Sequence, residues 1–136
     1  MWVTDRENEI YTYLKYRALV ALQTKYPNLF FTQDDSVNES PKFPCVYVHF
    51  LSPIETGQEL DNSSVNAIAL TVQIDVTVTE HMGMAAATEV SDNVVENLKR
   101  LRFSILGFPE FSNLDTTTKR KVIRAERTIG VDDILF

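Results

Sequence analysis

The stretch that decides the fold is residues 66–80, which read NAIALTVQIDVTVTE. Apolar residues alternate with polar or small ones along it, the apolar set being Ile68, Leu70, Val72, Ile74, Val76 and Val78. Successive side chains of a strand point to opposite faces of a sheet. The pattern therefore predicts one long strand with a core on one face and water or a polar partner on the other. At ~3.4 Å per residue it spans about 40 to 50 Å, so we expect it to reach past the domain body or to bend at a bulge.

Shorter segments complete the predicted sheet. Residues 29–33 and 43–51 predict two strands before the long one, and residues 119–129 predict the last strand. Both faces of the 43–51 segment are apolar, so we expect an interior strand that is covered on both sides. The acidic residues 53–64 predict a long hairpin loop, and residues 108–118 predict a loop with aromatic anchors.

Two segments have helical periodicity. In the first, Thr4 and Glu7 have the spacing of a capping box, and Pro27 ends the helix. Its apolar stripe consists of Ile10, Tyr13, Leu14, Ala18, Ala21 and Leu22. The second runs from about residue 84 to 102, with a stripe of Ala87, Val90, Val94, Leu98 and Leu101. Acidic residues lie toward its start and basic ones in its last turns, which complements the helix dipole.

These elements predict an α+β domain in the order α-β-β-β-α-β. We expect an antiparallel sheet of about four strands, with two amphipathic helices packed on one face. The chain of 136 residues suits one domain over residues 1–136, with short terminal segments at 1–4 and 131–136. The sequence has no apolar run that would span a bilayer, and we expect no secretory leader. Its single cysteine suits a reducing cytoplasm.

The sequence contains no motif that names an enzyme or a cofactor. His49 and His81 lack the spacing of zinc ligands, so we expect no metal site. Cys45 stands at a strand start, where cysteines are usually small buried residues. Asp75, on the polar face of the long strand, is expected to be a solvated carboxylate. We therefore expect no catalytic residues, no cofactor and no enzymatic activity.

Charge is unevenly distributed in a chain whose net charge is −6. Acidic residues outnumber basic ones in residues 1–80, whereas the last strand is basic, with Lys119, Arg120, Lys121, Arg124 and Arg127. This strand is the best candidate for a binding surface. It fits a solvated edge strand or a contact with an acidic protein surface. It fits nucleic acid less well, because apolar residues rather than stacking aromatics stand between the cations.

Several features taken together resemble one known family. Residues 43–50 read FPCVYVHF, an X-Pro-x-x-Tyr-x-x-Phe strand entry, and a polar loop leads from it into the long alternating strand. A helix that ends at Leu101-Arg102 then precedes Leu106-Gly107-Phe108 and an arginine-bearing last strand. Over roughly residues 5–130, this layout resembles the neck and tail-terminator proteins of tailed bacteriophages.

The resemblance implies a structural virion protein that forms a ring of six copies. Such rings cap the tail tube and join it to the head–neck connector, and genomic DNA passes through the central hole. The implied partners are copies of the chain itself, the tail tube protein, the connector protein and DNA in transit. The implied location is the neck of a phage particle, after synthesis in the cytoplasm of a bacterial host. No catalytic residue accompanies this family.

Charge segregation suggests how copies would meet. We expect acidic loop residues of one copy to face basic residues of the next, and the apolar C-terminus to dock on an adjacent copy. The interface candidates are Glu55, Glu59, Asp61, Lys119, Arg120, Arg124, Arg127 and Phe136. The alternative is a small non-enzymatic α+β module that binds a protein or a ligand on its polar sheet face. An enzyme built from scattered carboxylates is a third possibility.

Overall fold

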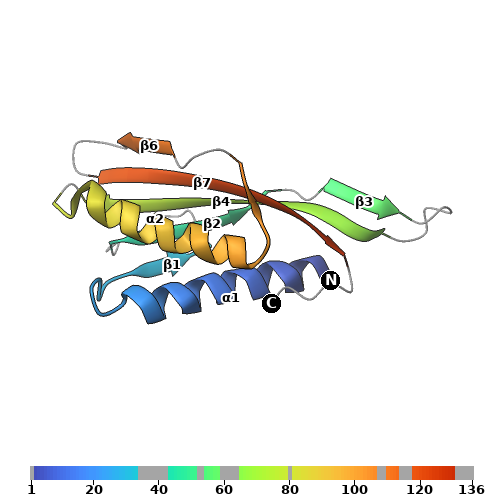
Figure 1. Cartoon of the computed structure of the whole chain (residues 1–136), viewed down its shortest axis with the longest axis horizontal. Coiled ribbons are helices and arrows are strands. Elements are labelled where there is room, and N and C mark those ends of the chain that lie inside the picture. Colours follow the sequence, from blue (N-terminus) through green and yellow to red (C-terminus); the bar gives the residue numbers. More distant parts are fainter. Residues whose placement is uncertain are drawn as a thin grey trace.

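Two helices and seven strands make up the part of the chain that the computed structural model describes, residues 2–33, 43–51, 54–58, 65–79, 81–106, 110–113 and 118–130. In chain order (Figure 1) they are α1 (Trp2–Leu22), β1 (Phe30–Thr32), β2 (Cys45–Phe50), β3 (Ile54–Gln58), β4 (Val65–Thr79), α2 (Gly83–Arg100), β5 (Ser104–Ile105), β6 (Glu110–Asn113) and β7 (Thr118–Gly130). The predicted α+β class is confirmed, and so are both helices and the long alternating strand, which is β4.

The seven strands form one mixed sheet. Its main order is β1-β2-β4-β7-β5, with β3 paired to the start of β4 and β6 paired to the start of β7. Every pair is antiparallel except β1 and β2, which run parallel. The prediction of an antiparallel sheet of about four strands is therefore wrong in two respects. A parallel pair needs a connection longer than a hairpin turn, and residues 33–44 supply one of sufficient length.

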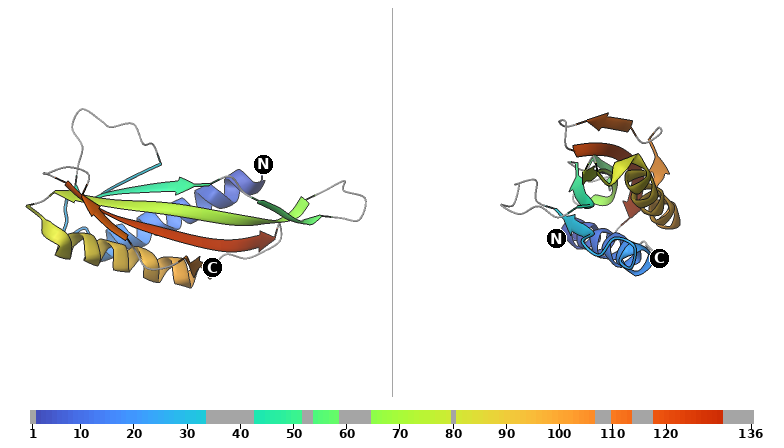
Figure 2. Two further views of the ribbon diagram at one scale, coloured as in Figure 1. Left: turned by 90° about the horizontal axis from the view of Figure 1, so that it is seen from above. Right: turned by 90° about the vertical axis from the view of Figure 1, so that its left-hand side faces the viewer.

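The sheet has one buried face and one open face, as the alternation along β4 predicts. The even-numbered residues from Ile68 to Val78 are almost fully buried, whereas the odd-numbered residues from Ala67 to Thr79 are half-exposed. Both helices lie on the buried side (Figure 2). They contribute two stripes to the core, Ile10, Leu14, Ala18 and Leu22 from α1 and Val90, Val94, Leu98 and Leu101 from α2.

The long strand extends past the helices. Figure 1 shows β3 and the beginning of β4 projecting beyond the N-terminal end of α1. β4 pairs with β7 along most of its own length, from Ala67 opposite Gly130 to Thr79 opposite Thr118. Of the two predicted outcomes, a reach beyond the domain body is the one found, and it leaves a projecting arm built from β3 and the start of β4.

The helix ends differ from those predicted. α1 begins at Trp2, so Thr4 lies inside the helix and the predicted capping box is wrong. Ala21, predicted in the apolar stripe, is exposed. α2 ends at Arg100, and Arg102 adopts a positive φ of 65°. The amide of Phe103 then donates to the carbonyl of Leu98 at 3.0 Å, which turns the chain away from the helix axis.

Three strands occur where loops were expected or no strand was recognised. β3 lies within the predicted hairpin loop, β6 lies within the predicted aromatic loop, and β5 follows α2 directly. The interior position of β2 is confirmed, since it lies between β1 and β4. The expectation that both of its faces are covered is wrong, because His49 is exposed on the side away from the helices.

Candidate interaction surface

The face of the sheet opposite the helices is the main candidate for an interaction surface. We call it the open sheet face. Its described side chains are Tyr47 and His49 on β2, Thr71, Gln73, Asp75 and Thr77 on β4, and Arg120, Val122, Arg124 and Glu126 on β7. They lie on one face because each alternates with a buried residue on its own strand, such as Val48, Ile74 or Ile123.

A chain of polar contacts crosses the open sheet face. The Nε of Arg124 donates to Oε1 of Gln73 at 3.1 Å, and Nε2 of Gln73 donates to Oδ1 of Asp75 at 3.3 Å. The other carboxylate oxygen of Asp75 lies 3.7 Å from Nη1 of Arg120. The strand register produces these contacts, since Gln73 is directly opposite Arg124, and Asp75, two pairs further along, is diagonal to Arg120. Asp75 is thus a paired carboxylate, not the solvated one that the sequence predicted.

An aromatic pair lies beside this polar chain. The rings of Tyr47 and His49 stack with their centroids 5.7 Å apart and an interplanar angle of 19°. Tyr47 is opposite Asp75 and His49 is opposite Gln73 in the pairing of β2 with β4. Because Tyr47 and His49 are two residues apart on one strand, both rings point outward from the open sheet face.

The basic residues of the last strand are divided between the two faces of the sheet. Arg120 and Arg124 belong to the open sheet face, whereas Lys121 and Arg127 alternate with them and lie on the helix side. Nη1 of Arg127 donates to the backbone carbonyl of Leu101 at 2.8 Å. Lys119 is opposite the buried Val78 and lies on the helix side as well, so the five predicted cations form two sets on opposite faces. Arg120, Arg124 and Arg127 each have a polar contact within the chain.

The acidic half of the predicted interface lies mostly outside the described residues. Glu59, Asp61 and Phe136 are among the residues that the structure does not describe. Glu55 lies on β3, opposite Ile68 of β4. The pairing of these residues with a neighbouring copy stays a prediction.

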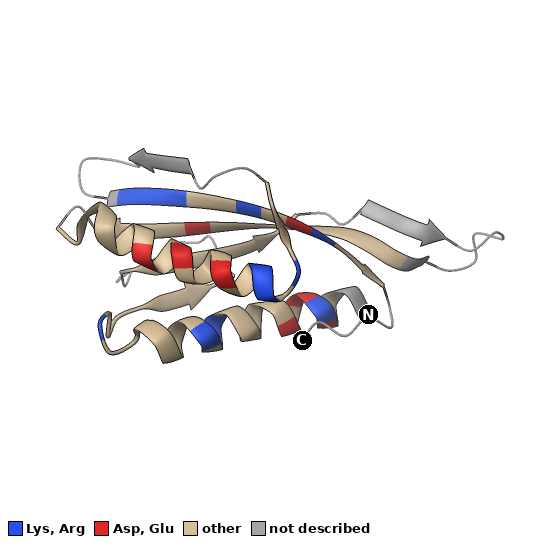
Figure 3. Cartoon of the chain, in the orientation of Figure 1, with Lys and Arg blue, Asp and Glu red and all other residues tan. Residues whose placement is uncertain are grey.

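A second charged surface was not singled out from the sequence. The outer face of α2, which points away from the core, carries Glu89, Asp92 and Glu96 on successive turns (Figure 3). The signal was available, because these residues are spaced by three and four positions and fall opposite the apolar stripe of the same helix. Lys99 and Arg100 follow them at the helix end.

Two of these carboxylates have partners in the same chain. Nζ of Lys25 lies 2.7 Å from Oε2 of Glu89, and Glu96 pairs with Arg100 at 2.9 Å. The hydrogen bond from Lys25 lowers the pKa of Glu89 below its usual value, and the same bond raises the pKa of Lys25. The hydroxyl of Tyr26 also donates to Glu89, at 3.3 Å.

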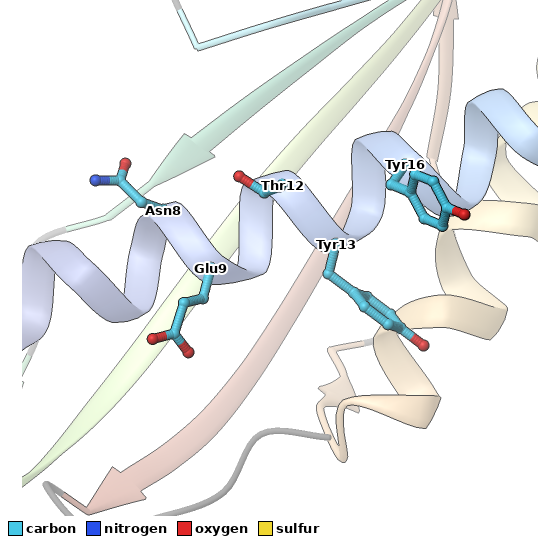
Figure 4. A pocket seen from close by; sticks show the side chains of 5 residues that line it. All are labelled: Asn8, Glu9, Thr12, Tyr13 and Tyr16. Atoms are coloured by element: carbon cyan, nitrogen blue, oxygen red, sulfur yellow. The ribbon is translucent and has the colours of Figure 1, made fainter.

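A shallow hollow lies on the outward side of α1. It has a volume of about 420 Å³, and the described residues that line it all belong to this helix, namely Asn8, Glu9, Thr12, Tyr13 and Tyr16 (Figure 4). In Figure 4 the amide of Asn8 points away from the two tyrosine rings, so the polar groups do not converge on one point. A hollow of this kind offers apolar contact area and no reaction site.

The described residues provide no arrangement typical of catalysis. Among them, no three His, Cys, Asp or Glu side chains are grouped so that they could hold a metal ion. Cys45 is half-buried, and burial raises the pKa of its thiol, which disfavours the thiolate that a nucleophile requires. None of the helices in the described part of the chain is long and apolar enough to cross a membrane.

Comparison with known proteins does not assign the chain to a family. The chain matches no protein-family model and no curated protein sequence.

Proposed function

We propose that the protein is a structural subunit in the neck of a tailed bacteriophage. Six copies form a ring that caps the tail tube and joins it to the head–neck connector, and the genome passes through the central hole. Its partners are other copies of the chain, the tail tube protein and the connector protein, and its location is the virion. It contributes binding surfaces to the particle and catalyses no reaction.

The observation that supports this proposal best is the open sheet face. Both helices cover the opposite face of the sheet, so among the described elements neither helix packs on the broad polar surface to which Tyr47, Gln73 and Arg124 belong. A subunit in a ring needs two different surfaces, one for each neighbour. The open sheet face and the outer faces of the helices point in different directions and can supply them.

The projecting arm gives further support. β3 and the start of β4 extend beyond the helices, where they are available to another molecule (Figure 1). Strand edges are templates for adding a strand from a neighbour. A ring subunit with such an arm can reach across its interface and hold the next copy.

Native mass spectrometry over a range of protein concentrations tests the proposal. A closed ring of six 15.5 kDa subunits has a mass of roughly 93 kDa. We expect this species, and we expect negative-stain images of the same sample to show a ring with a central hole. A chain that remains monomeric at all concentrations, or that forms only open filaments, would contradict the ring.

A binding module is the second candidate function, and the stacked pair of Tyr47 and His49 favours it. His49 is exposed and stacks on Tyr47, so the pair offers an aromatic surface that can hold a planar ligand or a peptide side chain. Saturable binding by a monomer, with loss of binding in His49→Ala, would support this alternative over the ring.

A further inference from the structure

We propose that, in the ring, the open sheet face of one copy receives the outer face of α2 of the next copy. This inference rests on the proposed ring and names its interface. The occupant is a second copy of this chain, because the chain carries both halves of a charge-complementary pair on opposite sides.

The basic half of the pair lies on β7. Arg124 is exposed, and within the described residues its guanidinium is hydrogen-bonded only to the neutral amide of Gln73. Arg120 lies on the same face, where Asp75 partly balances its charge at 3.7 Å. The positive charge of Arg124 is thus available to a partner.

The acidic half lies on α2. Asp92 is exposed at the middle of the outer face, and the described part of the chain gives it no ion-pair partner. Glu96 pairs only with Arg100, and both side chains are more than half exposed. An exposed pair of this kind contributes little to stability, so Glu96 can exchange its partner at small cost.

The charges along β7 and along α2 also follow each other in complementary order. Along the open sheet face, β7 carries Arg120, Arg124 and then Glu126, whereas α2 carries three carboxylates followed by Lys99 and Arg100. At ~3.4 Å per strand residue, the two arginines are about 14 Å apart. At 1.5 Å per helix residue, the three carboxylates span about 10 Å. A helix laid parallel to β7 therefore places carboxylates near Arg120 and Arg124, and it places Lys99 and Arg100 near Glu126.

The proposed contact joins two different faces of the chain. A two-fold interface instead places the same patch on both subunits. Contact between the two different faces gives a head-to-tail chain of subunits, which is the type of interface that closes into a ring.

Charge reversal at one residue of each face tests the interface. Asp92→Lys and Arg124→Glu are suitable because neither removes an ion pair that the described residues make. Asp5→Lys and Lys15→Glu, both exposed on α1, are the matched controls with the same changes in net charge. Circular dichroism establishes that each variant is folded, and native mass spectrometry then gives its oligomeric state.

We expect each interface variant alone to need at least ten times more protein than the controls to form the ring. The double variant, Asp92→Lys with Arg124→Glu, has the wild-type net charge and restores the contact with its sign reversed, so we expect it to assemble. A mixture of the two single variants should also form rings, with equal numbers of each, because both contacts in an alternating ring are attractive.

The outcomes separate this inference from the proposed function. If the wild type forms a ring of six and both reversals assemble like their controls, the interface is elsewhere and the ring stands. If the reversals disrupt and the mixture restores an open polymer or a dimer without ring closure, the interface stands and the ring does not. A wild type that never self-associates overturns both.

Discussion

Arg127 on β7 donates a hydrogen bond from Nη1 to the backbone carbonyl oxygen of Leu101, at a distance of 2.8 Å. The two residues are far apart in sequence, and Leu101 is the cap residue at the end of α2. The last carbonyl groups of a helix have no partner within the helix and carry a partial negative charge. From the neighbouring strand, the arginine therefore gives the carbonyl of Leu101 a hydrogen-bond donor and offsets the partial negative charge at the end of α2.

Replacing Arg127 should weaken the fold. We expect Arg127→Met to lower the free energy of unfolding by about 1 to 2 kcal/mol, because it removes a charge-assisted hydrogen bond from a partly buried carbonyl. Urea denaturation of dilute protein measures the change. Arg124→Met is the control, since its arginine lies on the open sheet face, and it should cost less than about 0.5 kcal/mol. Equal losses in the two variants would contradict the capping role.

The positive φ of Arg102 leads to a stabilising substitution. This residue has a φ of 65°, a conformation that glycine adopts without the steric penalty of a Cβ atom. We expect Arg102→Gly to raise the free energy of unfolding by about 0.5 to 1 kcal/mol. Arg102→Ala retains the Cβ atom and should give no such gain. Arg100→Gly, two residues earlier at the last position of α2, should lower stability by about 1 kcal/mol.

The two faces of β4 should respond differently to truncation. Ile74 is fully buried between the sheet and the helices, so Ile74→Ala leaves a cavity and should cost about 2 to 5 kcal/mol. Thr77 is half-exposed on the open sheet face, and Thr77→Ala should cost less than about 1 kcal/mol. Thermal and urea unfolding of both variants measure the difference. Similar losses would mean that a second layer covers the open sheet face in the isolated chain.

The pair of Lys25 and Glu89 should be visible in titration. The pKa of Glu89 is lowered in the folded protein, so its contribution to stability is present above the unfolded pKa and is lost as the pH falls through the folded pKa. The pKa of Lys25 is raised, so its contribution is present below its unfolded pKa and disappears as the pH rises through the folded value.

We therefore expect Lys25→Met to raise the pKa of Glu89 toward its usual value, as measured by NMR titration of the carboxyl carbon. Arg100→Met serves as the control, because it removes the partner of Glu96 and leaves the hydrogen bond from Lys25 in place. A pKa of Glu89 that stays unchanged in Lys25→Met would show that Tyr26 or another group holds it.

The elements with strong periodicity could be predicted from the sequence, and the short ones could not. The 15 residues of β4 and the stripe of α2 provide many repeats of one pattern, so a single residue that departs from the pattern does not change the prediction. β5 has two residues and β6 has four, which is too few for a period to be recognised. These strands form because β7 offers them an edge, and that edge exists only in the folded sheet.

The parallel pairing of β1 with β2 was hidden for a similar reason. Three residues of β1 specify a strand but not its direction, which depends on the path of the connecting chain. The end of α2 was placed too late because Arg102 occupies a position where glycine is the usual signal.

The faces of the last strand follow from its sequence, because alternation alone places Arg120 and Arg124 on one face and Lys121 and Arg127 on the other. The contacts of Arg124 with Gln73 and of Arg120 with Asp75 depend on the register between β4 and β7, which no local pattern specifies. The outward position of His49 depends on which face of the sheet the helices cover. The sequence of β2 does not reveal that face, because both faces of this strand are similarly apolar.

The length of the β4–β7 pair has a mechanical consequence. Thirteen consecutive residue pairs join these antiparallel strands, from Ala67 with Gly130 to Thr79 with Thr118. Tension applied along the strands at opposite ends loads all of their hydrogen bonds in shear at once, whereas a pull across them would open one bond at a time. The pair connects the projecting arm at one end of the molecule to the start of α2 at the other. The protein therefore contains a stiff two-stranded ribbon along its long axis (Figure 1), which resists stretching between the projecting arm and α2.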